Sequence, residues 1–205
     1  MRNFQRGLTM VETLVTLIIV LSGLLGLAGV QAKVMQAELE LYQRAQALDL
    51  MYDMVTRIKA NQKAGRCYAI TTESGAPALG AASVRPTACS SVAGTSGVLA
   101  NSDLTDWDSL LRGAHESSGG GKLGVMVDAR GCVTRQTNSD DSVTYGVGVA
   151  WRGVNATNFP TYPAGITAAA KRAIDCGRNQ YGADAASGAE LRRVVWTTFS
   201  VANLM

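Results

Sequence analysis

The chain has 205 residues, of which 47% are hydrophobic and 17% charged, and its formal net charge is +3. This length leaves room for one domain with a real core beside an apolar N-terminal segment. The small positive charge is not gathered into a long basic stripe, which argues against nucleic-acid recognition, because that function needs Lys and Arg clustered on one face.

The first predicted element is an apolar helix of 23 residues, Leu8 to Val30. Its length is close to the roughly 20 residues that a bilayer-spanning helix requires. It carries one charge, Glu12, and a charged side chain in a bilayer core costs about 2.5 to 3.5 kcal/mol, so we expect a partner charge for it. Arg2 and Arg6 precede the span, and short basic segments tend to stay in the cytoplasm. We therefore expect the rest of the chain to lie outside.

The segment from Gly7 to Glu12 resembles the type IV prepilin signature. In that family a short basic leader ends in Gly, a prepilin peptidase cuts after it and methylates the new N-terminus, and a Glu at the fifth mature position is the charge partner. The resemblance implies that residues 1–7 are a leader, that cleavage falls between Gly7 and Leu8, and that Leu8 is N-methylated. Glu12 would then be the charge partner in assembly. The family most often has Phe in place of Leu8, and the leucine keeps a bulky apolar residue there.

Two other interpretations of this N-terminal segment stay open. A secretory signal peptide with a small-residue cleavage site at Val30-Gln31-Ala32 would release an exported, disulfide-bonded protein that begins at Lys33. Against it, Glu12 lies in what would be the uncharged region, and the helical pattern continues past Ala32 without a break. A plain single-span membrane anchor is the other alternative, since the length of the apolar run fits one.

Residues 31–60 are predicted to continue the same helix in amphipathic form, because apolar residues recur at spacings of three and four. The expected apolar stripe is Val34, Ala37, Leu41, Ala45, Leu48, Tyr52, Val55 and Ile58. Glu40 with Arg44, and Asp53 with Arg57, fall at i, i+4 in the favourable order. A helix over 8–60 would be roughly 80 Å long at 1.5 Å per residue. We expect its first half in a membrane or fibre interior and its second half packed against a globular domain.

Residues 61–205 are predicted to form that globular domain, beginning with an irregular connecting region over 71–121. Its first part, Thr71 to Ala100, is rich in small residues and carries only Glu73 and Arg85 as charges. Thr105-Asp106-Trp107-Asp108 has the form of a capping box, which predicts a short helix that ends near Gly113.

The four cysteines, Cys67, Cys89, Cys132 and Cys176, are an even number, and none belongs to a C-x-x-C pair. Two disulfides in an oxidising periplasm are the expected use. Four cysteines allow three pairings. We favour Cys67 with Cys89, which closes a local loop, and Cys132 with Cys176, which joins two segments of predicted sheet.

A sheet is predicted over 122–205. The expected strands are Leu123 to Val127, Cys132 to Arg135, Val143 to Trp151 and Arg193 to Val201. Strict alternation in the third strand indicates one core-facing side, and Asp128 to Gly131 is typical of a hairpin connection between the first two strands. The predicted fold class is α+β, with a long N-terminal helix packed on a C-terminal antiparallel β-sheet, as in type IV pilins.

Within the pilins, the chain resembles the PilV-type minor pilins, also called type IV pilus modification proteins. The resemblance lies in Leu21–Gln31, in Ala45–Asn61, and in Cys176-Gly177 followed by Arg192-Arg193-Val194 and a final strand. It implies a minor subunit that joins other minor pilins in an inner-membrane priming complex, starts assembly with the major pilin, and displays a PilY-type tip adhesin. The expected location is the bacterial inner membrane with a periplasmic domain, and the pilus fibre or tip after assembly. A type II secretion pseudopilin, which shares the leader and helix, stays open as an alternative.

No catalytic, cofactor-binding or metal-binding residue is predicted, and we do not expect an enzyme. Gly119 to Gly124 formally matches G-x-G-x-x-G, yet it precedes a predicted strand, so the helix N-terminus that binds phosphate would be missing. His115 is the only histidine, and with scattered cysteines it makes a poor metal set.

Overall fold

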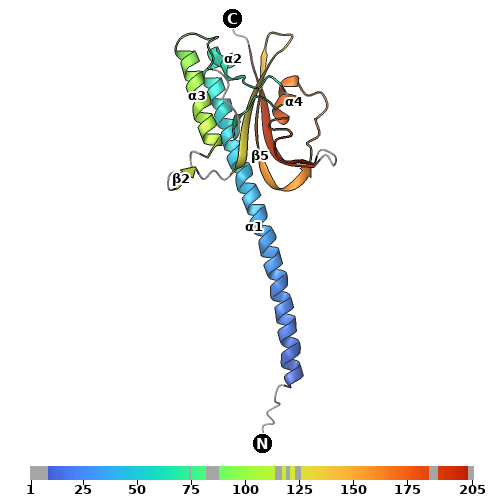
Figure 1. The fold of residues 1–205 in the computed structure, drawn as a ribbon. Coiled ribbons are helices and arrows are strands. Elements are labelled where there is room, and N and C mark those ends of the chain that lie inside the picture. The colour runs from blue at the N-terminus through green and yellow to red at the C-terminus, as the bar shows by residue number, and fades with distance from the viewer. Residues whose placement is uncertain are drawn as a thin grey trace, which may run out of the picture. The chain divides into compact units, whose positions relative to one another are not determined.

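The computed structural model describes residues 9–73, 75–81, 88–113, 117–118, 121–122, 126–184 and 189–202 (Figure 1). The chain divides into two compact units, Met1–Leu41 and Tyr42–Met205. The helices are α1 (Met10–Ala60), α2 (Gly65–Tyr68), α3 (Thr95–Leu111) and α4 (Ala168–Ile174), with a 3-10 turn, η1 (Gln62–Ala64). The strands are β1 (Leu79–Gly80), β2 (Ser117–Ser118), β3 (Gly121–Lys122), β4 (Val127–Thr137), β5 (Val143–Asn158), β6 (Ala183–Asp184) and β7 (Ala189–Val201).

Helix α1 confirms the predicted long N-terminal helix and ends at Ala60, as expected. Its first turn carries Glu12 and its last turn carries Arg57 and Lys59, which is the charge order that complements the helix dipole. Glycine residues within the apolar half do not interrupt it. The helix supplies the regular structure in the described part of the first unit and the first element of the second.

The buried face of α1 in the second unit differs from the predicted stripe. Ala47, Met51, Met54 and Ile58 are the positions that become almost fully buried, whereas Tyr52 of the predicted stripe is 57% exposed. Val55 and Ile58 are buried as expected, and Val34, Leu41 and Ala45 are exposed. The buried residues keep spacings of three and four, so the predicted helical periodicity is confirmed. The prediction of which side of the helix is buried was wrong. Tyr52 fits the apolar pattern, but the side chains of Met51 and Met54 are the ones packed in the core.

Helix α3 corrects two predictions about the connecting region. Residues 95–100 belong to α3, so the predicted irregular stretch is wrong there. Thr105 does not cap a helix, because it lies inside α3, where its hydroxyl donates a hydrogen bond to the carbonyl of Asn101 at 2.7 Å. Trp107 is fully buried, and its indole Nε1 donates to the carbonyl of Leu50 at 2.9 Å, which ties α3 to α1.

The second unit contains a five-stranded antiparallel sheet in the order β1-β4-β5-β7-β6, which confirms the predicted α+β class. The expected hairpin at Asp128 to Gly131 is wrong, because these residues lie within β4, where Arg130 pairs with Ala150 of β5. The register shifts between Val127 and Arg130, and Asp128 has φ of 53°. The turn-like residues therefore mark a β-bulge. Most of the predicted strand Leu123 to Val127 lies outside the described residues.

The two faces of the sheet are covered by different helices. Tyr145, Val147, Val149 and Trp151 of β5 are buried in one core with residues of α1 and α3, as their alternation predicted. Short helix α4, which was not predicted, packs on the other face, where β5 has small residues (Figure 1). A Cβ atom at Gly148 would lie 2.4 Å from the carbonyl oxygen of Ala173 in α4, so only glycine permits this approach.

Two disulfide bonds link the second unit, and they have the favoured pairing of the three possible ones. Cys67 is bonded to Cys89 with a Cα–Cα distance of 5.4 Å, and Cys132 is bonded to Cys176 at 5.7 Å. The first attaches the segment before α3 to α2. The second joins β4 to the end of α4, so it fixes the helix that covers the outer face of the sheet.

Candidate functional site

The first unit presents an apolar helical surface with one carboxylate. From Thr9 to Ala32, Glu12 is the only charged residue, and all of these residues are exposed. Large apolar side chains point in every direction around the helix, including Leu14 at 52%, Ile19 at 66% and Leu25 at 75% exposure. By length and composition, α1 contains a candidate membrane span. A helix that is apolar on all sides is suited to an apolar environment.

Glu12 lies in the first turn of α1. Its backbone N–H donates to the hydroxyl of Thr9 at 3.4 Å, and the carbonyl of Thr9 accepts from the N–H of Thr13 at 3.3 Å. The pattern Thr9-x-x-Glu12 has the form of a capping box, a signal in the sequence that would have identified Thr9 as a helix start. A negative side chain is favourable at a helix N-terminus, so the helix itself gains from Glu12.

The carboxylate of Glu12 is nevertheless available to a partner. Among the described residues, no Lys or Arg forms an ion pair with it. A cation supplied by another chain, such as an amino terminus, would remove the cost of keeping this charge in an apolar environment. Gly7 and Leu8, the predicted cleavage and methylation residues, lie outside the described residues.

The second unit contains a partly buried polar cluster that links α1, α2 and α3. Arg57 donates to Asp53 at 2.8 Å and to Asp103 at 2.9 Å. The hydroxyl of Tyr68 donates to the other carboxylate oxygen of Asp103, and Asn61 donates to that hydroxyl at 3.1 Å. Only the Asp53–Arg57 pair was predicted. Asp103 and Tyr68 come from distant parts of the chain, and no local spacing in the sequence could have indicated them.

Burial and the neighbouring carboxylates change the pKa values of Tyr68 and Arg57. Burial and the hydrogen bond to Asp103 raise the pKa of the Tyr68 hydroxyl well above its usual value. For Arg57, burial acts to lower the pKa, but the neighbouring carboxylates of Asp53 and Asp103 outweigh it and raise the pKa. Tyr68 is therefore neutral and Arg57 charged at physiological pH. The cluster is therefore a fixed link between helices.

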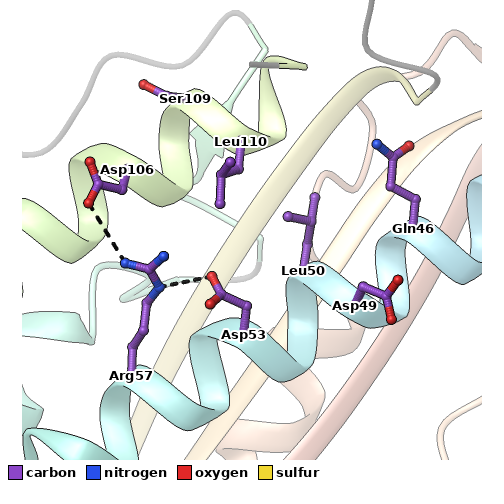
Figure 2. Close-up of a pocket in the computed structure, with 8 residues that line it drawn as sticks. All are labelled: Gln46, Asp49, Leu50, Asp53, Arg57, Asp106, Ser109 and Leu110. Carbon is purple, nitrogen blue, oxygen red and sulfur yellow. Dashed lines mark hydrogen bonds and ion pairs between the residues drawn. The ribbon is translucent and has the colours of Figure 1, made fainter. Parts of the chain in front are cut away.

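A groove of about 700 Å³ lies beside this cluster, between α1 and α3 (Figure 2). We call it the acidic groove. Its lining residues are Gln46, Asp49, Leu50, Asp53, Arg57, Asp106, Ser109 and Leu110. Figure 2 shows Leu50 and Leu110 pointing into the space between the helices, with Arg57 reaching from α1 toward Asp106 of α3. The groove therefore combines an apolar floor with acidic margins.

A second polar surface lies where the loop before α4 meets that helix. We call it the cationic patch, and it consists of Phe159, Tyr162, Lys171 and Arg178. The Lys171 ammonium lies 5.0 Å from the ring centroid of Tyr162, and the Arg178 guanidinium lies 5.3 Å from that of Phe159. Both distances are in the range of cation–π contacts. The hydroxyl of Tyr162 donates to buried Asp175 at 2.5 Å, which fixes the loop to the end of α4.

Comparisons of the chain with protein-family models, with curated proteins and with solved structures gave no match. The functional argument therefore rests on the residues and their geometry. All four cysteines are bonded within the second unit, so none of them is a nucleophile or a metal ligand in this structure. His115 and most of the Gly119 to Gly124 motif lie outside the described residues.

Proposed function

We propose that the protein is a minor pilin of the PilV type. It would join other minor pilins in an inner-membrane complex that initiates type IV pilus assembly with the major pilin and displays a PilY-type adhesin at the tip. The observation that carries this proposal is the exposed, largely apolar surface of α1 from Thr9 to Ala32, in which Glu12 is the only charged residue. A prepilin peptidase would act first, between Gly7 and Leu8.

The charge of Glu12 is what distinguishes this proposal from a plain membrane anchor. An anchor helix has no use for a carboxylate in its apolar half, because the charge opposes insertion by about 2.5 to 3.5 kcal/mol. An assembling helix has a use for it, because a neighbouring amino terminus can pair with the carboxylate only in the correct axial register. Glu12 would therefore set the register of one subunit against the next.

The second unit supports an assembly role in a different way. Its two disulfides and its partly buried polar cluster fix helices on both faces of one sheet, which gives a stable domain for display outside the cytoplasm. Its described surface presents a groove and a charged patch, both of which can contact other subunits. A rigid domain on a long apolar helix suits a subunit that acts by contact with other subunits.

Mass spectrometry of the mature protein from its native membrane tests the proposal. A chain that begins at Leu8 with a methylated amino group is the expected result. A chain that begins at Lys33 would contradict the proposal and support an exported protein released by signal peptidase. A methylated Leu8 is also expected of a type II secretion pseudopilin, and incorporation of the protein into pili, seen by immunoblotting of sheared fibres, separates these two machines.

Glu12→Ala tests the role of the carboxylate separately from processing. We expect normal cleavage after Gly7 and reduced incorporation into fibres, because the partner charge is lost. Glu38→Ala is the matched control, since it removes a carboxylate from an exposed position of α1 beyond the apolar run. Equal fibre incorporation by both variants would show that Glu12 only supports the helix N-terminus.

A further inference from the structure

Two surfaces of opposite charge lie on opposite sides of the sheet in the second unit. The acidic groove lies between α1 and α3, which cover one face, and the cationic patch lies at α4, which covers the other (Figure 1). The proposed function uses neither surface. Both surfaces combine charge with apolar or aromatic groups, which is the composition of protein contact surfaces rather than of simple solvated ones.

The acidic groove has more negative charge than its one cation balances. Asp53 and Asp106 lie at 2.8 and 3.8 Å from the guanidinium of Arg57, which also pairs with Asp103. The side chain of Asp106 is 60% exposed and that of Asp53 is 35% exposed, and Asp49 adds a further exposed carboxylate. Arg57 itself is only 24% exposed, so an approaching chain meets carboxylates first.

The floor of the groove selects the kind of cation that fits. Leu50 is buried beneath the margin, and Leu110 is partly buried across from it (Figure 2). A lysine or arginine can place its aliphatic stem on these leucines and its charged end among the carboxylates. A hydrated metal ion gains nothing from such a floor. The groove is therefore suited to a cationic side chain of a protein.

The cationic patch presents such side chains in a fixed arrangement. Lys171 is exposed above the Tyr162 ring, and the side chain of Arg178 is 41% exposed above Phe159. Arg178 is paired with buried Asp175 at 3.3 Å, so Lys171 supplies the unbalanced positive charge of this surface. Because the aromatic rings already restrict the two cations, less conformational entropy is lost when they bind a partner.

We propose that the acidic groove of one copy of this chain binds the cationic patch of a second copy, with Lys171 placed among Asp49, Asp53 and Asp106. A copy cannot fill its own groove, since the two surfaces lie on opposite sides of its sheet (Figure 1). The contact joins two different surfaces, so each bound pair keeps one free groove and one free patch. Such a heterologous contact adds further copies in one direction until a ring closes or a filament forms.

This inference extends the proposed function, in which copies held in one membrane have a raised effective concentration for each other. It does not depend on cleavage after Gly7 or on Glu12. A chain that is never processed as a prepilin can still form the contact, and a processed one can lack it. The two proposals therefore fail separately.

Zero-length cross-linking tests the contact directly. Full-length chains, one sample labelled with ¹⁵N and one unlabelled, are mixed in detergent micelles and treated with a water-soluble carbodiimide, which couples a carboxylate to an amine in contact with it. Cross-linked peptides are then identified by mass spectrometry. We expect amides between Lys171 and Asp49, Asp53 or Asp106 in which one peptide is labelled and the other is not. Absence of such mixed pairs would overturn the proposal.

Charge reversal supplies the second arm of the test. In Asp49→Lys with Asp106→Lys, mixed coupling of Lys171 to the remaining Asp53 should fall about tenfold, because close interfacial charge pairs of this kind contribute at least this factor. Lys171→Glu removes the amine that the carbodiimide needs, so for this variant the expected loss is of mixed dimers measured without cross-linking, by size-exclusion chromatography. Combining all three substitutions should restore cross-linking between the same positions with amine and carboxylate exchanged. Lys63→Gln, on the exposed turn η1, is the control and should change nothing. The proposal would be contradicted if the Lys171→Glu variant and the Asp49→Lys, Asp106→Lys variant both still form dimers and these dimers are not cross-linked at the groove and patch positions.

Discussion

Tyr68 occupies the centre of the polar cluster that joins three helices. Its hydroxyl donates to Asp103 and accepts from Asn61, and the ring is fully buried. A buried hydroxyl in such a network stabilises the fold because both of its neighbours lose a partner when it is removed. Within the described part of the chain, the side chain of Asp103 would then keep Arg57 as its partner, and that of Asn61 would keep the carbonyl of Ser96.

Tyr68→Phe should therefore lower the free energy of unfolding by about 1 to 3 kcal/mol, the cost of leaving buried polar groups unsatisfied. Urea titration followed by tryptophan fluorescence measures it, since all three tryptophans lie in the second unit. Tyr52→Phe is the matched control, because Tyr52 is 57% exposed, and we expect a change below about 0.5 kcal/mol. Similar losses in the two variants would show that the cluster contributes nothing specific.

The raised pKa of Tyr68 also predicts how stability changes at alkaline pH. Burial, and then Asp103, raise the pKa of the hydroxyl in the folded state above the value of about 10 expected for an unfolded chain. The resulting stabilisation is present below about pH 10 and is lost as the pH rises toward the folded-state pKa. Stability should decline above pH 10, and less steeply in Tyr68→Phe. Urea titrations between pH 8 and pH 11 compare the slopes, and equal slopes would contradict the assignment.

Residue-level prediction from sequence reached only local partners. Asp53 and Arg57 are one helical turn apart, and the structure pairs them at 2.8 Å. Asp103 is 46 residues from Arg57, and only the tertiary fold brings it there. Arg57 thus looked like a solvated helix residue, while it is the cation shared by carboxylates of two helices.

Helix α4 packs closely against glycines of β5. From the sequence, these glycines were recognised only as small residues on one face of a strand. A Cβ at Gly146 would lie 2.7 Å from the carbonyl of Ala169, and one at Gly148 would lie 2.4 Å from that of Ala173. Both contacts are with backbone atoms, which cannot turn aside as a side chain can. The absence of side chains on β5 is therefore what allows the helix to lie against the strand.

Gly148→Ala should separate α4 from β5 and destabilise the second unit by about 1 to 3 kcal/mol, the usual cost of overpacking. Urea unfolding measures the loss, and amide hydrogen exchange should show reduced protection in α4. Gly26→Ala is the control, since an added methyl group there meets nothing within 4 Å. If Gly148→Ala leaves both stability and protection unchanged, the close contact does not constrain this face.

Periodicity in the sequence predicted which helices and strands exist more reliably than it predicted which face of each one is buried. The long helix and the central strand β5 were expected from strong patterns over many residues. Helix α4 has seven residues, too few for a clear period, and α3 begins in a stretch of small residues that hides its apolar face. The bulge at Asp128 uses the same residue types as a turn, so local chemistry alone predicted the wrong connection.

The two disulfides divide the stabilisation of the second unit unequally. Cys132 and Cys176 are 44 residues apart and fully buried, whereas Cys67 and Cys89 are 22 apart, with Cys89 partly exposed. The larger loop restricts the unfolded chain more, so chain entropy predicts about 4.0 kcal/mol for Cys132–Cys176 and about 3.4 kcal/mol for Cys67–Cys89. Removing the Cys132–Cys176 bond also leaves buried space beside the sheet.

Cys132→Ala with Cys176→Ala should accordingly destabilise the protein more than Cys67→Ala with Cys89→Ala. Urea titration of the two double variants beside the unmodified chain gives the comparison. We further expect α4 to lose hydrogen-exchange protection in the first variant only, because that bond alone attaches the end of α4. The reverse order of stability would show that the local loop before α3 is the more important restraint.

The division of the chain into two units predicts that the second folds without the first. The buried face of α1 begins at Gln43 and Ala47, while residues 9–39 of the same helix are exposed. A chain that begins at Tyr42 would lose the apolar surface that is suited to an apolar environment, yet it would keep the described core and both disulfides. It should be soluble without detergent and unfold cooperatively.

This shortened chain should match the full-length protein in free energy of unfolding to within about 1 kcal/mol, because none of the buried residues is removed. A chain that begins at Tyr52 is the control: it lacks Ala47, Leu50 and Met51, and it should lose several kcal/mol, since deletions of buried apolar side chains cost 2 to 5 kcal/mol each. Tryptophan fluorescence during urea titration compares all three. If the chain from Tyr42 is unfolded, residues 9–41 stabilise the second unit, and the apolar half of α1 has a structural role besides the proposed insertion and assembly.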